Sequence, residues 1–361
     1  MKRAVLCVSN PHDYIDDLDE YSIMIINPDS TELRKKYLLE NSDYSLFITD
    51  KKEILRNGSD YDNERVFWYT SGTTGDSKFY GFSKTQVERM ASVICNAYDL
   101  NYNDRYVSLM PLWHAHGQGF YWATKKIGCQ TDFLAARDLR KIQNFSPTFL
   151  TAVPDILKIL TQFKFDQLRF VRSASAPLPN YLYQQLQDCF HVPVIEAFGM
   201  TEALSHCFTN PLHGEQRMGT VGLPDGIETR IDEEQRLWIR GPCVFTDQWV
   251  DTGDLACQDE KGYFRILGRS TDQINIRGIK INPLTIENQL CSKFPNITEC
   301  AIFGKDRLKC VYVGNVNEQE VIDWLISLGS YCRPKFLQKV NEIPKNNVGK
   351  ISRSLLENFY I

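Results

Sequence analysis

The sequence predicts an α/β protein with a large N-terminal part and a small C-terminal part. Apolar runs alternate with helical segments up to about residue 200, which is typical of a largely parallel sheet covered by helices. After about residue 219 the pattern changes to short strands separated by Gly, Pro and Asp, as in a compact β unit. From about residue 272, strands and a helix mix again. We therefore expect two domains, residues 1–270 and residues 271–361.

In the N-terminal half, the predicted elements follow one another as strand and helix. Two short β-rich runs, residues 21–27 and 44–49, flank a charged stretch that suits a helix. The run VFWYT reads as a strand, and residues 84–100 have apolar positions at helical spacing. Further segments continue the alternation: RYVSLMPLWHAHG, TFLTAVP, DILKILTQF, LRFVRSASAPLP, YLYQQLQDCF and VPVIEAFGMTE.

In the C-terminal half, short strands dominate. The compact β unit is expected to contain TVGLPD, IETRID, RLWIRG, QWVDTGD and YFRILGR. The last part combines two strands with one helix and so predicts a small α+β domain: ECAIFG, KCVYVGN and EQEVIDWLISLG.

Composition narrows the class of protein. The chain has 361 residues, 43% of them hydrophobic, so it can bury a large core. Its net charge is −4 and it has no long run of Lys and Arg, so nucleic acid is not an expected partner. The 11 cysteines are spaced singly, which predicts reduced thiols and a cytoplasmic location. The N-terminal apolar run is too short for a signal peptide, and no stretch reaches the ~20 residues of a membrane span.

The stretch SGTTGDSK, residues 71–78, follows the VFWYT run and suggests a phosphate-binding loop. Its glycines let backbone N–H groups approach a ligand closely, and its hydroxyls add small donors. Lys78 would supply a charge against the outer phosphates. The spacing differs from the common G-x-x-x-x-G-K-[ST] loop, and a mobile polar turn is the usual meaning of such a run when it stands alone.

Four further motifs follow this loop in a fixed order. With SGTTGDSK they resemble the adenylate-forming (AMP-binding) superfamily of acyl-CoA synthetases, aryl-acid ligases, luciferases and peptide-synthetase adenylation domains. The resemblance runs from about residue 66 to the C-terminus, with G-D-S-K in place of the usual G-x-P-K. Only about seventy residues precede the loop, fewer than the family usually has, so we expect part of the acid-pocket wall to be missing or supplied by a partner subunit. The four motifs are FGMTE (198–202), TGDL (252–255), GRSTDQINIRG (268–278) and NNVGKISR (346–353).

The resemblance implies ATP- and Mg²⁺-dependent activation of a carboxylic acid to acyl-AMP. The acyl group then passes to a thiol, either coenzyme A or the phosphopantetheine of an acyl or aryl carrier protein. A homodimer is a further expectation. The alternative from a different class is an inactive nucleotide- or acyl-binding regulatory protein. Retention of all five ligand-like residues favours an enzyme: Lys78, Glu202, Asp254, Arg269 and Lys350.

The resemblance assigns the nucleotide-binding roles residue by residue. Thr201 would donate to the α phosphate, Glu202 would bind Mg²⁺, and Lys350 would bridge the acid carboxylate and the α phosphate. Asp254 would accept from the ribose hydroxyls, with Arg269 beside it. The phosphate grip would use Thr70, Ser71, Gly72, Thr73, Thr74, Gly75 and Lys78, and the adenine site would use Ser175, Ala176, Pro177, Phe198, Gly199 and Met200.

Each of these residues also has an ordinary structural interpretation. Glu202 would suit a helix N-terminus, Phe198 simple core packing, and Asp254 a turn. Arg269 could be a surface arginine and Lys350 a solvated lysine near the C-terminus. Only their combination in one chain favours the functional interpretation.

The resemblance also implies that the small C-terminal domain rotates between the two half-reactions. The hinge would be Thr271 and Asp272, where the family usually has Asp or Lys at the first position. A threonine can absorb the backbone change. The path of the thiol arm would be formed by Arg277, Gly278 and Ile279.

The element PLWHAHGQG, residues 111–119, matches the family segment near the substrate carboxylate. His114 takes the position of the family histidine, and His116 is additional; an H-x-H zinc site is disfavoured because no third ligand is near in sequence. No Asp lies between residues 108 and 124, so the acid is not expected to be an α-amino acid. The acid pocket would be formed by Trp113, His114, Gly117 and Gly199, with Phe120, Tyr121 and Trp122 either holding an acyl or aryl tail or packing in the core.

Overall fold

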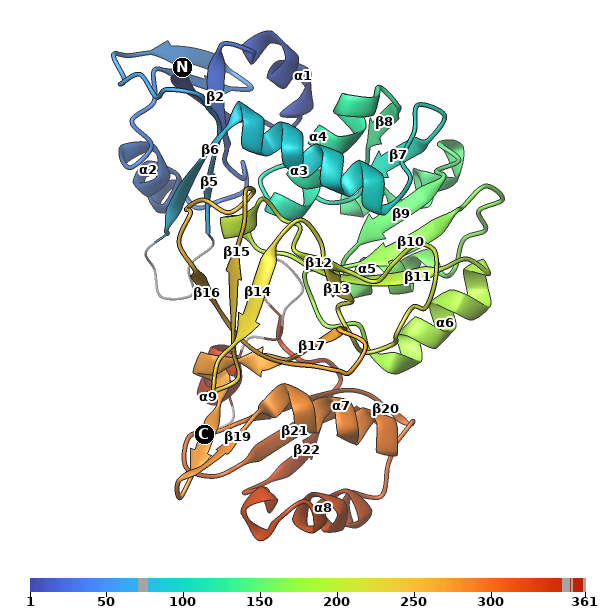
Figure 1. Ribbon diagram of the computed structural model, residues 1–361. Coiled ribbons are helices and arrows are strands. Elements are labelled where there is room, and N and C mark those ends of the chain that lie inside the picture. Colours follow the sequence, from blue (N-terminus) through green and yellow to red (C-terminus); the bar gives the residue numbers. More distant parts are fainter. Residues whose placement is uncertain (71–76, 346–350, 352, 360–361) are drawn as a thin grey trace.

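The first sheet of the protein is built mainly from the N-terminal residues. In the computed structural model, which describes residues 1–70, 77–345, 351 and 353–359, this sheet has the strand order β4-β3-β1-β2-β5-β6 (Figure 1). Its four inner strands are parallel: β1 (Lys2–Cys7), β2 (Tyr21–Ile25), β3 (Leu46–Thr49) and β5 (Glu64–Tyr69). Antiparallel β4 (Lys52–Leu55) and β6 (Phe79–Ser83) form its edges, and α1 (His12–Ile15) and α2 (Glu32–Glu40) connect the strands.

The second sheet carries the central part of the chain, in the order β13-β12-β11-β10-β9-β7-β8. Five of its strands are parallel: β7 (Arg105–Ser108), β8 (Gln130–Phe133), β9 (Phe149–Ala152), β10 (Phe170–Ser173) and β11 (Val194–Phe198). Two short antiparallel strands, β12 (Phe208–Thr209) and β13 (Leu223–Pro224), complete one edge. The covering helices are α3 (Lys84–Ala97), α4 (Ala115–Ile127), α5 (Pro154–Leu160) and α6 (Asn180–Phe190).

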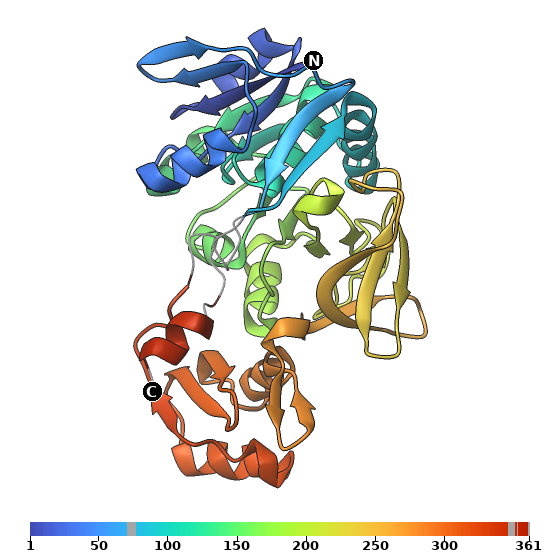
Figure 2. The ribbon, with the colours of Figure 1, turned by 90° about the vertical axis from the view of Figure 1, so that its left-hand side faces the viewer.

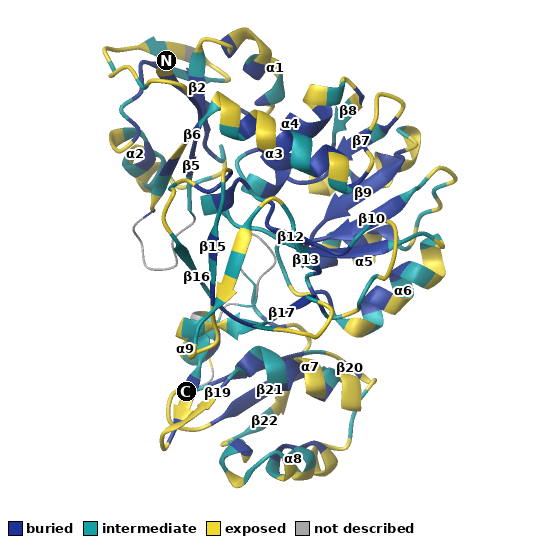
Figure 3. Cartoon of the chain, viewed as in Figure 1, coloured by how far each residue is buried: buried dark blue, intermediate teal, exposed yellow. Residues whose placement is uncertain are grey.

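Successive residues of the parallel strands face different cores, as the pleat of a strand requires. Tyr106, Phe149 and Phe170 stack on one face and pack with α3, α4 and the first sheet. Their neighbours Val107, Leu150 and Val171 pack on the opposite face with α5 and α6. The strands are therefore buried on both faces, which explains their continuous apolar sequence (Figure 3).

Two smaller β units follow. Antiparallel β14 (Glu228–Ile231), β15 (Arg236–Arg240), β16 (Val250–Gln258) and β17 (Phe264–Arg269) pack around a core that they share with Phe208 of β12. The C-terminal part has a hairpin, β18 (Ile274–Ile276) and β19 (Ile279–Ile281), and a three-stranded sheet of β20 (Ile297–Phe303), β21 (Lys309–Gly314) and β22 (Leu337–Lys339). Its helices are α7 (Pro283–Lys293), α8 (Glu318–Ser327) and α9 (Arg353–Phe359).

The C-terminal part has a hydrophobic core of its own, in which Leu290 and Ile302 are fully buried. Figure 2 shows it as a separate lobe beneath the two large sheets. The predicted α/β class is confirmed. The division into domains at residues 270 and 271 stays a prediction, with the separate core in its favour.

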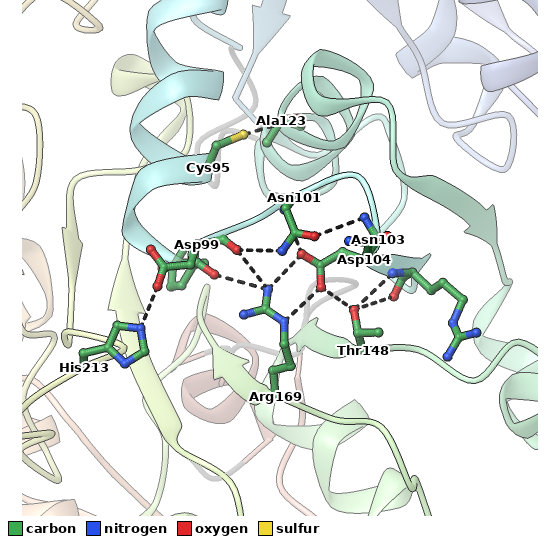
Figure 4. Close-up of polar contacts among 11 residues, drawn as sticks. Cys95, Asp99, Asn101, Asn103, Asp104, Ala123, Thr148, Arg169 and His213 are labelled. Carbon is green, nitrogen blue, oxygen red and sulfur yellow. Dashed lines mark hydrogen bonds and ion pairs between the residues drawn. The ribbon is translucent and has the colours of Figure 1, made fainter.

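A polar network ties together the N-terminal ends of three parallel strands (Figure 4). Asp104, only 2% exposed, accepts hydrogen bonds from Thr148 Oγ1 at 2.6 Å and from Arg169 Nη2 at 2.8 Å. Arg169 also reaches the backbone carbonyls of Tyr98 and Asp99. Because the partners of Asp104 satisfy its buried charge, the network fastens the sheet at the end opposite to the strand ends where ligands usually bind.

Candidate active site

Three of the predicted site segments follow parallel strands of the second sheet, whose strands are labelled in Figure 1. The turn 174–177 follows β10, the turn 199–202 follows β11, and the histidine-containing segment 109–117 follows β7. Since β9, β10 and β11 are adjacent and parallel, their C-terminal ends meet at one edge of the sheet. Open α/β sheets bind ligands at this edge.

Glu202 is held by two contacts from outside its own motif. Its Oε1 accepts a hydrogen bond from the Tyr80 hydroxyl at 2.9 Å, and its backbone carbonyl accepts from the Phe245 N–H at 2.9 Å. Burial and the neighbouring Glu202 carboxylate both raise the pKa of Tyr80, so its hydroxyl remains a donor. Glu202 lies in the first turn of a short 3₁₀ helix, Thr201–Ala203, so its alternative as a helix N-terminal carboxylate is also compatible with the structure.

The two ends of the predicted phosphate loop are joined by two hydrogen bonds between Thr70 and Lys78. The Thr70 N–H donates to the Lys78 carbonyl at 3.0 Å, and the Lys78 N–H donates to Thr70 Oγ1 at 3.2 Å. Arg34, on α2, donates to the Thr70 carbonyl and to Ser77 Oγ. Lys78 is exposed. Five predicted phosphate-binding residues lie outside the described residues: Ser71, Gly72, Thr73, Thr74 and Gly75. The predicted catalytic Lys350 also lies outside them.

The predicted adenine site occupies two half-exposed turns. Ser175 has a φ of +71°, an unusual backbone conformation for a non-glycine residue, and Ala176 and Pro177 follow it. Phe198 is half-buried, with its ring edge-on to Phe208 at a centroid distance of 5.9 Å. Phe198 thus packs against the core and still has an exposed portion, so both of its interpretations remain compatible with the structure.

The two predicted pocket glycines have a packing reason in this fold. A Cβ atom at Gly199 would lie 1.8 Å from the Ser205 carbonyl oxygen. A Cβ atom at Gly117 would lie 2.5 Å from the carbonyl oxygens of both Met110 and Pro111. Both glycines therefore permit close backbone approach beside the site, whatever their contact with the acid.

The two histidines of the PLWHAHG segment have different environments. His114 is half-buried at the N-cap of α4, with its ring 6.4 Å from that of Trp113. His116 is buried: its Nδ1 lies 3.0 Å from Ser175 Oγ, and its Nε2 lies 2.7 Å from Thr151 Oγ1 and 3.0 Å from Arg172 Nη1. Burial, then Arg172 and His114, hold the pKa of His116 well below its usual value.

Arg172 is almost completely buried, with 1% of its surface exposed. Its Nε donates to the Tyr98 hydroxyl at 2.8 Å and its Nη1 to Thr151 Oγ1 at 3.2 Å. Because a guanidinium can only donate, His116 Nε2 must be an acceptor and its Nδ1 carries the hydrogen. The His116 ring therefore donates from Nδ1 to Ser175 Oγ, which leaves the Ser175 hydroxyl hydrogen for another acceptor.

The predicted ribose residues pair with each other. Asp254 is 5% exposed, and its Oδ1 lies 3.2 Å from Arg269 Nε. The Asp254 N–H donates to Thr252 Oγ1 at 3.1 Å, and Arg269 Nη1 donates to the Thr252 carbonyl at 2.8 Å. This pairing holds the Asp254 carboxylate beside a partly exposed guanidinium, and a carboxylate suits recognition of hydroxyl donors.

The predicted hinge and the predicted thiol path are close in sequence, but the first forms a 3₁₀ turn and the second forms the turn and first residue of a β-hairpin strand. Thr271 and Asp272 form a 3₁₀ turn after β17, and Asp272 Oδ2 lies 3.4 Å from Arg353 Nη1. Arg277 (φ +53°) and Gly278 (φ +87°) form the two-residue turn of the β18–β19 hairpin, and Ile279 begins β19. The positive φ of the turn already explains why residue 278 is a glycine. The presence of Gly278 therefore gives no further support for a thiol path.

A small cavity joins the predicted acid pocket to the nucleotide motif. Thr201 and Trp113 line it together with residues of β2, β5 and α4, namely Ile25, Phe67, Trp68, Tyr69, Ala115 and Gln118. Phe120, Tyr121 and Trp122, by contrast, are buried in the core, so their alternative as the holders of an acyl tail is not supported.

The donor set fits one hard cation. Glu202 has one carboxylate oxygen bonded to Tyr80, and a carboxylate oxygen is the ligand type that Mg²⁺ prefers. No cluster of three His, Cys, Asp or Glu residues occurs among the described residues, so the protein portion of such a site would be a single carboxylate, with phosphate oxygens and water completing it.

With the site described, comparison with known proteins defines the class. The model of the AMP-binding enzyme family matches residues 57–247, more than half of the chain. The chain belongs to the AMP-binding enzyme family, and the resemblance predicted from the sequence is confirmed. Within the described residues, no helix is long and apolar enough to cross a membrane.

Individual relatives are named as CoA ligases. The oxalate–CoA ligase of Arabidopsis thaliana is 28% identical, over 89% of this chain and 73% of that protein. The 2-succinylbenzoate–CoA ligase of Bacillus licheniformis is 26% identical, over 92% of this chain and 84% of that protein. For several further relatives, the match spans only 61 to 67% of their own length.

The fold itself matches a solved structure closely. The crystal structure of ATP-bound MatB from Rhodopseudomonas palustris superposes with a TM-score of 0.88 at 21% identity, covering 99% of this chain and 88% of that one. Because the superposition covers 99% of this chain, the two proteins share the same architecture.

Several residues at the site were not singled out from the sequence. Tyr80, Arg34, Arg172, Thr151 and Gln118 all contact predicted site residues or line the cavity. Their positions follow from contacts between distant parts of the chain. The one available signal was Arg172, since an arginine inside an apolar strand predicts a buried partner network.

Proposed function

We propose that this protein is an AMP-forming acid–thiol ligase that uses ATP to convert a carboxylic acid into acyl-AMP and then transfers the acyl group to coenzyme A. The observation that carries the proposal is that segments 109–117, 174–177 and 199–202 all follow parallel strands of the second sheet. Thr201 and Trp113 share a cavity wall, Glu202 meets Tyr80, and Ser175 meets His116. The CoA-ligase names of the relatives support the acceptor.

In this mechanism each described residue has one task. Lys78 and the loop ends at Thr70 hold the outer phosphates, and Glu202 would hold Mg²⁺, which neutralises charge on the phosphates when bound. Asp254 accepts from the ribose hydroxyls, and Phe198 with the turn 175–177 holds the adenine. Lys350 would attract both the acid carboxylate and the α phosphate, so that attack of the carboxylate oxygen displaces pyrophosphate.

The second half-reaction needs a thiol at the acyl-AMP carbonyl. We propose that the part from Thr271 onward turns about Thr271 and Asp272 and brings the thiol arm past Arg277, Gly278 and Ile279. The thiolate sulfur then forms a thioester bond to the acyl carbon and AMP leaves. Loading of a carrier protein's phosphopantetheine is the alternative outcome, because it offers the same thiol.

Two expectations about the acid remain proposals. The absence of an Asp near the histidine segment argues against an α-amino acid. Oxalate and 2-succinylbenzoate, for which two relatives are named, each carry a second carboxyl group, and this supports acids with a further oxygen-bearing group. We also propose a cytoplasmic location. The 11 cysteines are all free thiols in the structure, which supports that location. A homodimer is a further proposal.

The test is acid-dependent pyrophosphate release from ATP across a library of mono- and dicarboxylic acids, followed by mass spectrometry of the thioester with coenzyme A or a carrier protein. We expect release with a narrow set of acids and a thioester only when a thiol is present. An absence of acid-dependent pyrophosphate across the library would contradict the proposal and favour the regulatory-protein alternative.

A further inference from the structure

Gln118 occupies an unusual position on α4. It is 3% exposed, and it lines the same small cavity as Trp113 and Thr201. Its Oε1 accepts a hydrogen bond from Trp68 Nε1 at 2.7 Å. An indole N–H is only a donor, so the amide atom that faces it must be the oxygen. The orientation of the Gln118 amide is therefore fixed by Trp68.

This orientation leaves the amide NH₂ group of Gln118 on the side away from Trp68. Within the described part of the chain, no hydrogen bond from that NH₂ group is found. Its nitrogen is not among the described side-chain atoms that are buried without a partner, so it is accessible from the cavity and can donate to an acceptor from outside the protein. The surrounding wall carries both apolar and polar groups: Ile25, Phe67, Trp68 and Trp113 together with the hydroxyl-bearing Tyr69 and Thr201.

We propose that Gln118 is a specificity-determining residue whose amide NH₂ donates to an oxygen of the acid other than those of the reacting carboxylate. The inference rests on the proposed function and deepens it. The acid would be a small one that carries a carbonyl or second carboxylate oxygen beyond its reacting group. A hydrocarbon acid of similar size would leave the NH₂ group without an acceptor and would be used poorly.

Trp68 has a positioning role in this arrangement. Without its Nε1–H, the Gln118 amide could turn over and present its oxygen to the cavity, where it would repel the oxygen of the acid. Trp68→Phe keeps most of the ring and removes only that donor. We therefore expect this variant to lose part of the same preference as Gln118→Met, which keeps the length of the side chain and removes the amide.

The experiment compares kcat/KM for malonate, 3-oxobutanoate and butanoate by pyrophosphate release, within the wider acid library. In Gln118→Met we expect the preference for the oxygen-bearing acids over butanoate to fall about tenfold, with butanoate itself little changed. Trp68→Phe should show a smaller fall in the same direction. The control is Gln162→Met at an exposed position, which should match wild type.

Loss of preference for malonate alone identifies a carboxylate acceptor, and loss for 3-oxobutanoate alone identifies a carbonyl acceptor; both support the inference. An unchanged preference in folded Gln118→Met, or an equal loss for all three acids, overturns it. A wild-type preference across the library for acids without a second oxygen overturns it too, while leaving the ligase activity intact. Only a wild type that releases no pyrophosphate with any acid would instead defeat the proposed function.

Discussion

Glu202 and Tyr80 lie 122 positions apart in the chain, and yet the Tyr80 hydroxyl donates to Glu202 at 2.9 Å. A motif residue thus acquires its orientation from a strand of the other sheet. Asp254 is held in the same manner by Arg269, from the next strand of its own sheet. The two carboxylates have different partners, so we expect their loss to affect different parts of the reaction.

We predict that Glu202→Gln slows adenylation and weakens its dependence on Mg²⁺, because a neutral amide is a poor ligand for a hard cation. Asp254→Ala should chiefly raise the apparent KM for ATP, since it removes the acceptor for the ribose hydroxyls. Steady-state pyrophosphate release at varied Mg²⁺ and ATP measures both effects. Glu233→Gln, at an exposed turn, is the control, and wild-type ATP and Mg²⁺ kinetics in both test variants would refute the nucleotide site.

The lowered pKa of His116 predicts how the stability of the protein depends on pH. Its folded-state pKa is lowered, so below the ordinary value of about 6.5 the unfolded chain binds a proton that the folded protein does not. Stability should therefore fall as the pH drops below about 6.5, by up to about 1.4 kcal/mol per pH unit from this group. His206, whose pKa is also lowered, acts in the same direction.

Denaturant unfolding of wild type and His116→Gln between pH 5 and 7.5 isolates the contribution of His116. The slope of stability against pH should be shallower in the variant below about pH 6.5 and equal to wild type above it. Equal slopes throughout would show that His116 is not held neutral in the folded protein.

The two ends of the strands in the second sheet have different roles: a polar network lies at the N-terminal ends, and predicted site residues lie at the C-terminal ends. Asp104 and Arg169 fasten the N-terminal ends of its strands (Figure 4). The turns 174–177 and 199–202 follow the C-terminal ends of β10 and β11. We predict that Arg169→Met destabilises the protein by about 3 kcal/mol, because it leaves the buried Asp104 charge without its main partner.

The KM for ATP should be unchanged in Arg169→Met at a temperature where the variant is folded. Thermal or denaturant unfolding measures the loss. His213→Gln, in an exposed pair with Asp99, is the matched control and should stay within about 0.5 kcal/mol of wild type. A raised KM for ATP in folded Arg169→Met would show that the two ends of the sheet are not independent.

Much of the element order could be predicted from the sequence because the strands are marked by apolar runs that are buried on both faces. The strand β1 (Lys2–Cys7) was missed, since its run AVLCV was considered only as a signal sequence; in the structure it lies in the middle of the first sheet. At the site, the motifs predicted which turns matter. They could not predict Tyr80, Arg172 or Gln118, because these residues reach the site through pairing of sheets and helices far apart in sequence.

At the scale of the whole molecule, the last described residue before the predicted catalytic lysine bridges two parts of the fold. Lys345 Nζ lies 2.9 Å from Asp155 on α5 and 2.9 Å from Glu299 on β20. Asp155 belongs to the second sheet's layer of helices and Glu299 to the C-terminal lobe (Figure 2). We interpret this contact as a stabiliser of the arrangement in which acyl-AMP forms.

We predict that Asp155→Asn slows adenylation about two- to fivefold, the scale of a half-exposed ion pair, and leaves the reaction of supplied acyl-AMP with coenzyme A unchanged or slightly faster. Single-turnover assays of the two half-reactions provide the measurement. Asp166→Asn, at an exposed position between α5 and β10, serves as the control. A uniform slowing of both half-reactions would argue against an arrangement-specific contact.

The central claim is that one site performs two half-reactions and that Lys350 serves only the first. The most direct measurement is a single-turnover comparison of wild type, Lys350→Ala and the exposed-lysine control Lys339→Ala, in acyl-AMP formation and in thiolysis of supplied acyl-AMP. Removing one preorganised charge should lower adenylation by about 10²- to 10³-fold in Lys350→Ala and leave thiolysis close to wild type. An equal loss in both half-reactions, or no loss in adenylation, would contradict the account.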